Sequence, residues 1–147
     1  MHIQGFVIHL KRASQRRGQV ETLLANAPCA MMVFDAVDGQ AITDAELSSV
    51  LSEKPLLRPS YPFQIGRGEI ACFLSHRAIW QRMVEEGIDQ ALILEDDVAL
   101  GQDFLAAFDC VSQFVGLDGF VQFQTRTIRD VAEIVEQNGR LRIIRPN

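Results

Sequence analysis

The chain has 147 residues, of which 48% are hydrophobic and 22% charged, and its formal net charge is −5. This length predicts one domain over residues 1–147, and the acidic balance argues against nucleic acid as a partner. The three cysteines (Cys29, Cys72 and Cys110) are far apart, and no stretch approaches the ~20 apolar residues of a membrane span. With no signal-peptide pattern either, we expect a cytoplasmic protein with reduced thiols.

The N-terminal third predicts a strand-helix-strand unit. Residues 5–10 form an apolar run, and an amphipathic helix follows in which apolar residues recur from Val20 to Ala27. Ser14 is the expected N-cap of that helix. A second strand at 30–34 ends in an acidic turn, Asp35 to Gly39. Such a unit predicts parallel pairing through a right-handed crossover.

A basic segment separates the first strand from its helix: Lys11, Arg12, Arg16 and Arg17. Positive side chains at a helix N-terminus favour anion binding. A solvated basic turn explains the same residues, and a peripheral contact with an anionic membrane surface is a further role for them.

The middle of the chain contains the strongest helical pattern. Thr43 to Glu46 matches a capping box, a long loop over Lys54–Gly68 follows, and residues 69–86 predict a helix that ends at Gly87. Its apolar stripe is Cys72, Phe73, Ile79, Trp80, Met83 and Val84. His76 falls within this stripe, either as a core histidine satisfied by one hydrogen bond or as a residue at the edge of a ligand pocket.

Residues 91–98, ALILEDDV, place four apolar residues directly before three carboxylates. The apolar run predicts a strand buried on both faces of a parallel sheet, and ligands bind beyond the carboxyl ends of such strands. Glu95, Asp96 and Asp97 would repel one another there, which favours a hard divalent cation, Mn²⁺ or Mg²⁺. An acidic turn that merely faces water is the alternative.

The last third predicts a helix from Phe104 to Val115, a strand over Gly119–Gln124, and a hairpin over 133–144 that turns at Asn138-Gly139. Because an uncovered strand edge pairs readily with another chain, we expect self-association through this hairpin, most simply as a homodimer.

Four segments, in order, resemble glycosyltransferase family 25, which includes bacterial lipooligosaccharide galactosyltransferases. They are FVIHLKRASQRR, DAVDG, GEIACFLSHRAIWQRMVEEG and ALILEDDVAL, and they span residues 6–100. The resemblance implies an α/β, GT-A-like fold with a Rossmann-like, mostly parallel sheet and flanking helices, here ending in the hairpin. It also implies an inverting transfer of a hexose, typically galactose, from a UDP-sugar donor to a lipooligosaccharide, LPS or other glycan acceptor.

Within that resemblance, Glu95-Asp96-Asp97 corresponds to the acidic metal motif, with Asp97 as the first candidate ligand and Glu95 as the second. Candidates for donor binding share polar side chains near the expected sheet edge or in the matching helix motif: Arg16, Asp35, Asp38, Ser75, Arg77, Glu95 and Asp96. Asp35 and Asp38 are explained equally well by turn chemistry before Gly39. His76 is the candidate catalytic residue, and the sequence does not identify the general base.

Family members are usually longer, so the chain resembles a short or truncated, donor-binding member. The alternative function is a non-catalytic nucleotide-sugar-binding or interaction domain that retains the fold. A receiver-type phosphoryl-transfer domain is disfavoured, because it needs an acidic pair where this chain has Lys11 and Arg12.

Overall fold

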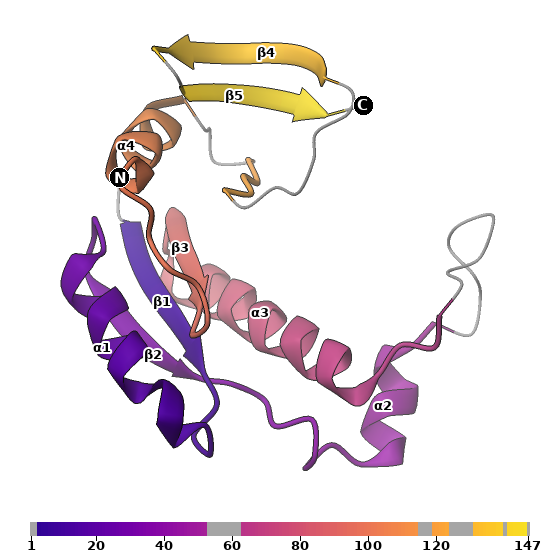
Figure 1. Ribbon diagram of the computed structural model, residues 1–147. Helices are drawn as coiled ribbons and strands as arrows, with labels where there is room; N and C mark the ends of the chain where they lie inside the picture. The colour runs from indigo at the N-terminus through magenta and orange to yellow at the C-terminus, as the bar shows by residue number, and fades with distance from the viewer. Residues whose placement is uncertain (1–2, 53–62, 115–118, 124–130, 140, 147) are drawn as a thin grey trace. The chain divides into compact units, whose positions relative to one another are not determined.

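The computed structural model describes residues 3–52, 63–114, 119–123, 131–139 and 141–146 (Figure 1). Its contacts divide the chain into two compact units, Met1–Ala99 and Leu100–Asn147. The first unit contains a parallel sheet with its helices, and the second contains a helix and an antiparallel hairpin.

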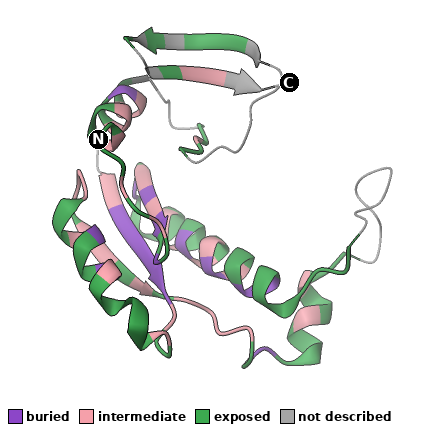
Figure 2. Ribbon diagram, viewed as in Figure 1, coloured by how far each residue is buried: buried purple, intermediate pink, exposed green. Residues whose placement is uncertain are grey.

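The sheet of the first unit has β1 (Ile3–His9) at its centre, between β2 (Met31–Asp35) and β3 (Gln90–Glu95). Both neighbours pair with β1 in parallel. The central position explains why β1 is buried without interruption from Gly5 to His9 (Figure 2). The predicted α/β class, with a parallel sheet, flanking helices and a C-terminal hairpin, is confirmed.

The connections between these strands place helices on opposite faces of the sheet. The chain passes from β1 through α1 (Arg17–Asn26) to β2, and from β2 through α3 (Arg67–Glu86) back across β1 to β3. Since right-handed crossovers that run in opposite directions put their helices on opposite faces, α1 and α3 enclose the sheet between them (Figure 1).

The core between the sheet and α3 is built on alternate residues of β1. Phe6 and Ile8 pack with Ile79 of α3 and with Ile88. The Phe6 ring meets Phe34 of β2 edge to face, with centroids 6.2 Å apart. Val7 points to the other face of the sheet, where Val20 and Leu23 of α1 are also buried.

The prediction that Ser14 is the N-cap of α1 is wrong. Ser14 begins a 3₁₀ turn, η1 (Ser14–Arg16), in which the Arg16 N–H donates to the Ala13 carbonyl at 2.9 Å, and α1 starts only at Arg17. Arg16 occupies the N-cap position without a side-chain cap. Its side chain instead reaches the carboxyl end of β3.

Local capping signals set the ends of the other helices in this unit. The capping box of Thr43 and Glu46 is confirmed at the start of α2 (Asp44–Val50), and Gly87 is confirmed as the C-cap of α3 with φ of 65°. Glu69 accepts a hydrogen bond from the Gly66 N–H at 2.7 Å, so α3 begins two residues earlier than predicted. Residues 53–62 of the predicted loop lie outside the described residues.

The predicted apolar stripe of α3 is only partly correct. Ile79 is buried, but Phe73, Trp80 and Val84 are exposed. The buried face of the helix runs through Ile70, Ala71, Ser75 and Ile79. Ile79 packs against the sheet, whereas Ile70 and Ala71 pack with Ile42 of the connection between β2 and α3. The side chains beside this face remain in contact with solvent.

The second unit contains α4 (Phe104–Phe114), β4 (Val131–Asn138) and β5 (Leu141–Pro146). The hairpin at Asn138-Gly139 is confirmed, and Gly139 has the positive φ of 58° that the turn requires. The predicted strand at 119–124 is wrong for Gly119–Phe123, and Gln124 lies outside the described residues. The Phe123 ring packs instead against Phe104 of α4, with centroids 5.2 Å apart.

Among the helices that the structure describes, none combines the length and the apolar character needed to cross a bilayer.

Gly39 lets the turn after β2 lie against the start of α3. A Cβ atom at this position would lie 2.9 Å from the carbonyl oxygen of Arg67, which is backbone and cannot rotate away. We expect Gly39→Ala to lower the free energy of unfolding by about 1–3 kcal/mol, measured by urea denaturation. In the control Gly18→Ala, a Cβ meets nothing within 4 Å, so the change should be neutral or stabilising. Equal stability of both variants would contradict this packing.

Candidate functional site

The candidate site lies at the carboxyl ends of β1 and β3. The strand order reverses at β1, since the chain moves first to β2 on one side and then to β3 on the other. Ligands of open parallel sheets bind at the carboxyl edge where this reversal occurs. Ile8 pairs with Glu95 in the sheet register, which brings the next residues, His9 and Asp96, to that edge.

Asp96 is a buried carboxylate at this edge of the sheet. It is only 6% exposed, and both carboxylate oxygens have partners. Oδ2 lies 2.7 Å from Nδ1 of His9, and Oδ1 accepts a hydrogen bond of 2.6 Å from Nη1 of Arg16. The three side chains therefore join the ends of β3 and β1 to the N-terminal end of α1.

The charge of Asp96 is stabilised despite its burial. Burial raises the pKa of this carboxyl group, but hydrogen bonds from His9 and Arg16, with the charge of Arg16, outweigh it and hold the pKa below its usual value. The hydrogen bond and charge of Asp96 in turn raise the pKa of Arg16. Asp96 is thus an ionised residue that positions its neighbours, and each of its carboxylate oxygens already accepts one hydrogen bond.

The carboxylates on either side of Asp96 are exposed. The Glu95 side chain is 49% exposed and the Asp97 side chain 55%. Asp97 Oδ2 lies 3.6 Å from Nη1 of Arg16, whose side chain is 45% exposed. Arg16 thus bridges the buried carboxylate and an accessible one.

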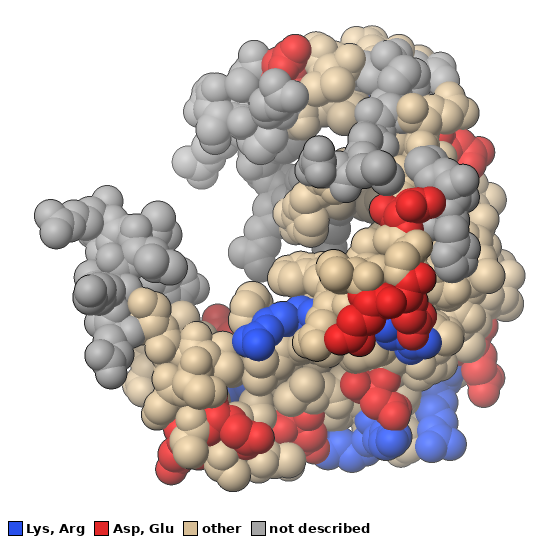
Figure 3. All heavy atoms as spheres, turned by 180° about the vertical axis from the view of Figure 1, so that it is seen from behind, with Lys and Arg blue, Asp and Glu red and all other residues tan. Residues whose placement is uncertain are grey.

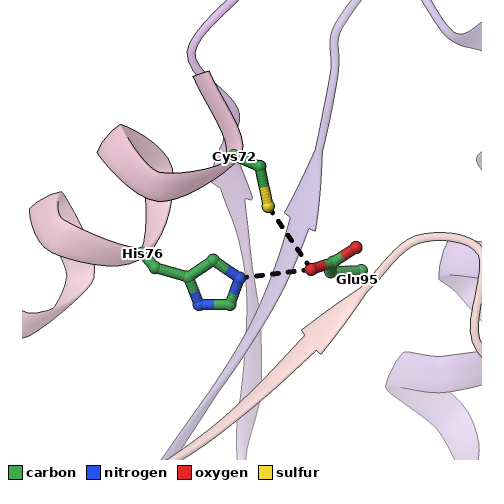
Figure 4. Close-up of side chains that lie close together, drawn as sticks. All are labelled: Cys72, His76 and Glu95. Atoms are coloured by element: carbon green, nitrogen blue, oxygen red, sulfur yellow. Dashed lines mark hydrogen bonds and ion pairs between the residues drawn. The ribbon is translucent and has the colours of Figure 1, made fainter. Parts of the chain in front are cut away.

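Glu95 faces α3. Its Oε1 accepts a hydrogen bond from the Cys72 thiol at 3.5 Å and lies 3.3 Å from Nε2 of His76 (Figure 4). Burial and the charge of Glu95 raise the pKa of that thiol. The His76 ring is half-buried and packs against Trp80, with centroids 6.1 Å apart. His76 therefore lies at the edge of the sheet next to a carboxylate.

Asp35 and Asp38 pair with the basic segment. Lys11 lies 2.7 Å from Asp35, and Arg12 donates to Asp38 at 2.8 Å. Asp38 also accepts from the Gln40 N–H at 2.9 Å, which is the turn chemistry considered for this residue. The hydrogen bonds from Arg12 and Gln40 lower its pKa. On the face shown in Figure 3, basic side chains lie beside acidic ones rather than in one continuous patch.

The structure does not bring Ser75 and Arg77 together with the carboxylates. Ser75 is buried, accepts from the Val37 N–H at 2.9 Å and donates to the Ala71 carbonyl at 2.8 Å, so its hydroxyl group joins α3 to the turn after β2. Arg77 lines a hollow of about 410 Å³ together with Ile42 and Glu46.

Sequence reasoning missed two members of the site, His9 and Cys72. His9 ends a predicted strand at the same sheet edge as the acidic run, so the topology contained a signal for it. Cys72 precedes His76 by four residues on one helix, the spacing at which side chains lie over one another. Nε2 of His9 is buried and has no hydrogen-bond partner among the described residues.

We expect Asp96→Asn to lower the free energy of unfolding by about 2–3 kcal/mol, because hydrogen bonds to charged groups contribute more than neutral ones. The adjacent Asp97→Asn is the matched control and should change stability by less than about 0.5 kcal/mol, since this carboxylate is exposed. Chemical denaturation of the two variants measures the difference. Similar losses in both would rule out a special role for the buried carboxylate.

The pH dependence of stability gives a second test of Asp96. Its pKa is lower in the folded chain than in the unfolded chain, so the stabilisation is present in full above the unfolded value of about 3.9 and is lost as the pH falls through the folded value. Between about pH 5 and pH 3, the wild type should therefore lose more stability than Asp96→Asn. Denaturation midpoints that fall in parallel for both proteins would disagree with this account.

Comparison with known proteins identifies relatives of the chain. A family model described as glycosyltransferase family 25 (LPS biosynthesis protein) matches residues 2–144. Human procollagen galactosyltransferase 2 is 34% identical over 101 residues, which cover 67% of this chain and 16% of that protein. Zebrafish procollagen galactosyltransferase 1 is 35% identical over 96 residues, 63% of this chain and 16% of that protein.

A third relative is the rat protein named probable inactive glycosyltransferase 25 family member 3, 36% identical over 105 residues, 67% of this chain and 18% of that protein. The chain thus spans about a sixth of the length of the curated relatives it matches. The family match covers nearly the whole chain, including the strand ends that form the site. The chain belongs to glycosyltransferase family 25.

Proposed function

We propose that this chain binds a UDP-sugar and takes part in metal-assisted transfer of a hexose, with galactose favoured, to a lipooligosaccharide, LPS or other glycan acceptor with inversion. The observation that carries the proposal is the pair of exposed carboxylates, Glu95 and Asp97, which flank a buried one at the carboxyl edge of the sheet. Two of the relatives are named procollagen galactosyltransferases, which supports galactose as the transferred sugar.

The donor atoms at this edge fit a hard divalent ion. Asp97 and Glu95 offer carboxylate oxygens, which suit Mn²⁺ or Mg²⁺, and Asp97 is the more accessible ligand. When bound, the ion neutralises charge on the departing diphosphate. Few protein ligands suffice, since Mg²⁺-like ions usually keep several waters and share their coordination with phosphates.

Arg16 is the candidate for direct contact with the diphosphate. Its guanidinium group is held at one end by Asp96 and remains 45% exposed near Asp97. A guanidinium fixed in this way offers charge-assisted hydrogen bonds to phosphate oxygens without much loss of side-chain entropy. In this proposal Asp96 and His9 position Arg16 and do not touch the donor.

His76 is the candidate for contact with the reacting groups. Its half-buried ring has Nε2 directed at Glu95, at the edge where the acceptor hydroxyl group would lose its proton. Asp35 and Asp38 would contact ribose, base or sugar hydroxyl groups through carboxylate lone pairs that their pairs with Lys11 and Arg12 leave unused. Ser75 would influence donor binding through the turn after β2, which its hydroxyl group joins to α3.

The second candidate function is a non-catalytic nucleotide-sugar-binding or interaction domain. The specific observation in its favour is that several similar proteins carry names that call them inactive. Turnover of UDP-sugars by the full chain separates the two functions, because only the transferase releases UDP. We further propose a cytoplasmic location, which the unpaired state of all three cysteines supports.

We expect UDP and Mn²⁺ together to raise the melting temperature more than either alone. At a ligand concentration of about one hundred times the dissociation constant, the folded state gains about 2.7 kcal/mol. For a chain of this size this corresponds to a rise of several degrees, measured by thermal denaturation. Asp97→Asn should abolish the Mn²⁺-dependent part of the rise.

The matched control is Glu85→Gln. Glu85 is an exposed carboxylate in the last turn of α3, near the opposite end of β3 from Glu95, so this variant should keep the full response. The absence of any Mn²⁺-dependent shift with every UDP-sugar tested would reject donor binding by this chain.

A further inference from the structure

Cys72, His76 and Glu95 bring three different donor atoms to one point. The sulfur, the imidazole nitrogen and a carboxylate oxygen all lie within 4.8 Å of one another. Cys72 and His76 are one turn apart on α3, and Glu95 is the last residue of β3 (Figure 4). The set combines a soft thiol, a borderline imidazole and a hard carboxylate, whereas Asp97 offers only hard oxygen donors.

Both separations from the Glu95 oxygen match those of a tetrahedral metal site, and the third pair of ligand atoms lies within 4.8 Å. Ligand bonds of about 2.3 Å to sulfur and about 2.0 Å to nitrogen and oxygen, at tetrahedral angles, put sulfur about 3.5 Å from oxygen and nitrogen about 3.3 Å from oxygen. The observed distances from Glu95 Oε1 are 3.5 Å to Sγ of Cys72 and 3.3 Å to Nε2 of His76. An ion could therefore enter between these atoms with little movement of the backbone.

The surroundings keep these side chains in place and leave one side open. The His76 ring rests on Trp80, and the Trp80 ring in turn meets Phe73 with centroids 6.4 Å apart. Cys72 and Glu95 are exposed, so solvent reaches the cluster and a water molecule could complete the coordination. Three protein ligands with a fourth position open to water are typical of catalytic zinc sites, whereas structural sites are closed.

We propose that Cys72, His76 and Glu95 bind one thiophilic divalent ion of the zinc class, at a centre distinct from Asp97. Glu95 is common to this centre and to the proposed donor site. Occupation by a zinc-class ion therefore withdraws Glu95 from the hard ion that Asp97 binds. Metal binding here does not require a nucleotide. A failure of this proposal therefore leaves the proposed function intact, and a failure of the proposed function leaves this proposal intact.

The test is a titration of the reduced, untagged full chain with Co²⁺ in the absence of nucleotide. We expect one equivalent to bind with a thiolate-to-cobalt charge-transfer band and intense tetrahedral absorption, and Zn²⁺ to remove both. Cys72→Ser should abolish the charge-transfer band, and His76→Ala should weaken binding by more than about tenfold. Circular dichroism of each variant confirms that the fold is retained.

The controls separate this centre from other thiols and from the donor site. Cys29→Ser and Cys110→Ser should keep the band, because neither thiol belongs to the cluster. Asp97→Asn should also keep it, although that variant is expected to lose the response to UDP with Mn²⁺. A wild type without the band at excess Co²⁺, or a band that survives Cys72→Ser, overturns the proposal. If Cys72→Ser does not fold, Glu95→Gln decides, since retention of full affinity there would overturn the three-ligand centre.

Discussion

The buried carboxylate of Asp96 is the interaction on which the rest of the site depends. Three segments that are distant in sequence end at this side chain: β1 through His9, the start of α1 through Arg16, and β3 through Asp96 itself. A buried charge is tolerated only when its oxygens are paired, so the two hydrogen bonds are a condition of the fold as well as of the site. The same pairing turns Asp96 inward and leaves its two acidic neighbours exposed to solvent.

Charge pairing also explains the basic segment after β1. Lys11 and Arg12 reach the acidic turn after β2, while Arg16 reaches the carboxyl end of β3. The positive charges thus hold together loops at the carboxyl edge of the sheet. Their exposed pairs contribute little stability each, but together they restrict the geometry of the edge where ligands of parallel sheets bind.

Much of the fold could be predicted because its signals are local. Apolar runs identified the three parallel strands, the Thr43–Glu46 box started α2, and Asn138-Gly139 specified the hairpin. The errors arose where a tertiary contact overrides a local preference. Ser14 is a good N-cap residue in isolation, but the 3₁₀ turn brings Arg16 to that position and to Asp96.

The position of the acidic residues on the sheet could be predicted from the sequence, but their surroundings could not. The run of apolar residues before Glu95, Asp96 and Asp97 predicted that these carboxylates lie at the carboxyl edge of the sheet. Sequence alone could not show that the middle carboxylate is buried and its neighbours are exposed. The partners that decide this orientation, His9 and Arg16, are 87 and 80 residues away along the chain. Likewise, the periodicity of α3 could not show which side of the helix the sheet and the β2–α3 connection cover, so Phe73, Trp80 and Val84 were wrongly predicted to be buried.

The exposed aromatic side of α3 gives the molecule a built-in optical reporter. The chain contains a single tryptophan, Trp80, and its ring lies 6.1 Å from that of His76, next to the acidic edge of the sheet. Indole emission is sensitive to the charge and polarity of adjacent groups. The tryptophan fluorescence of the unlabelled protein, excited selectively above the tyrosine band, therefore originates from one known position and reports on events at His76 without an attached dye.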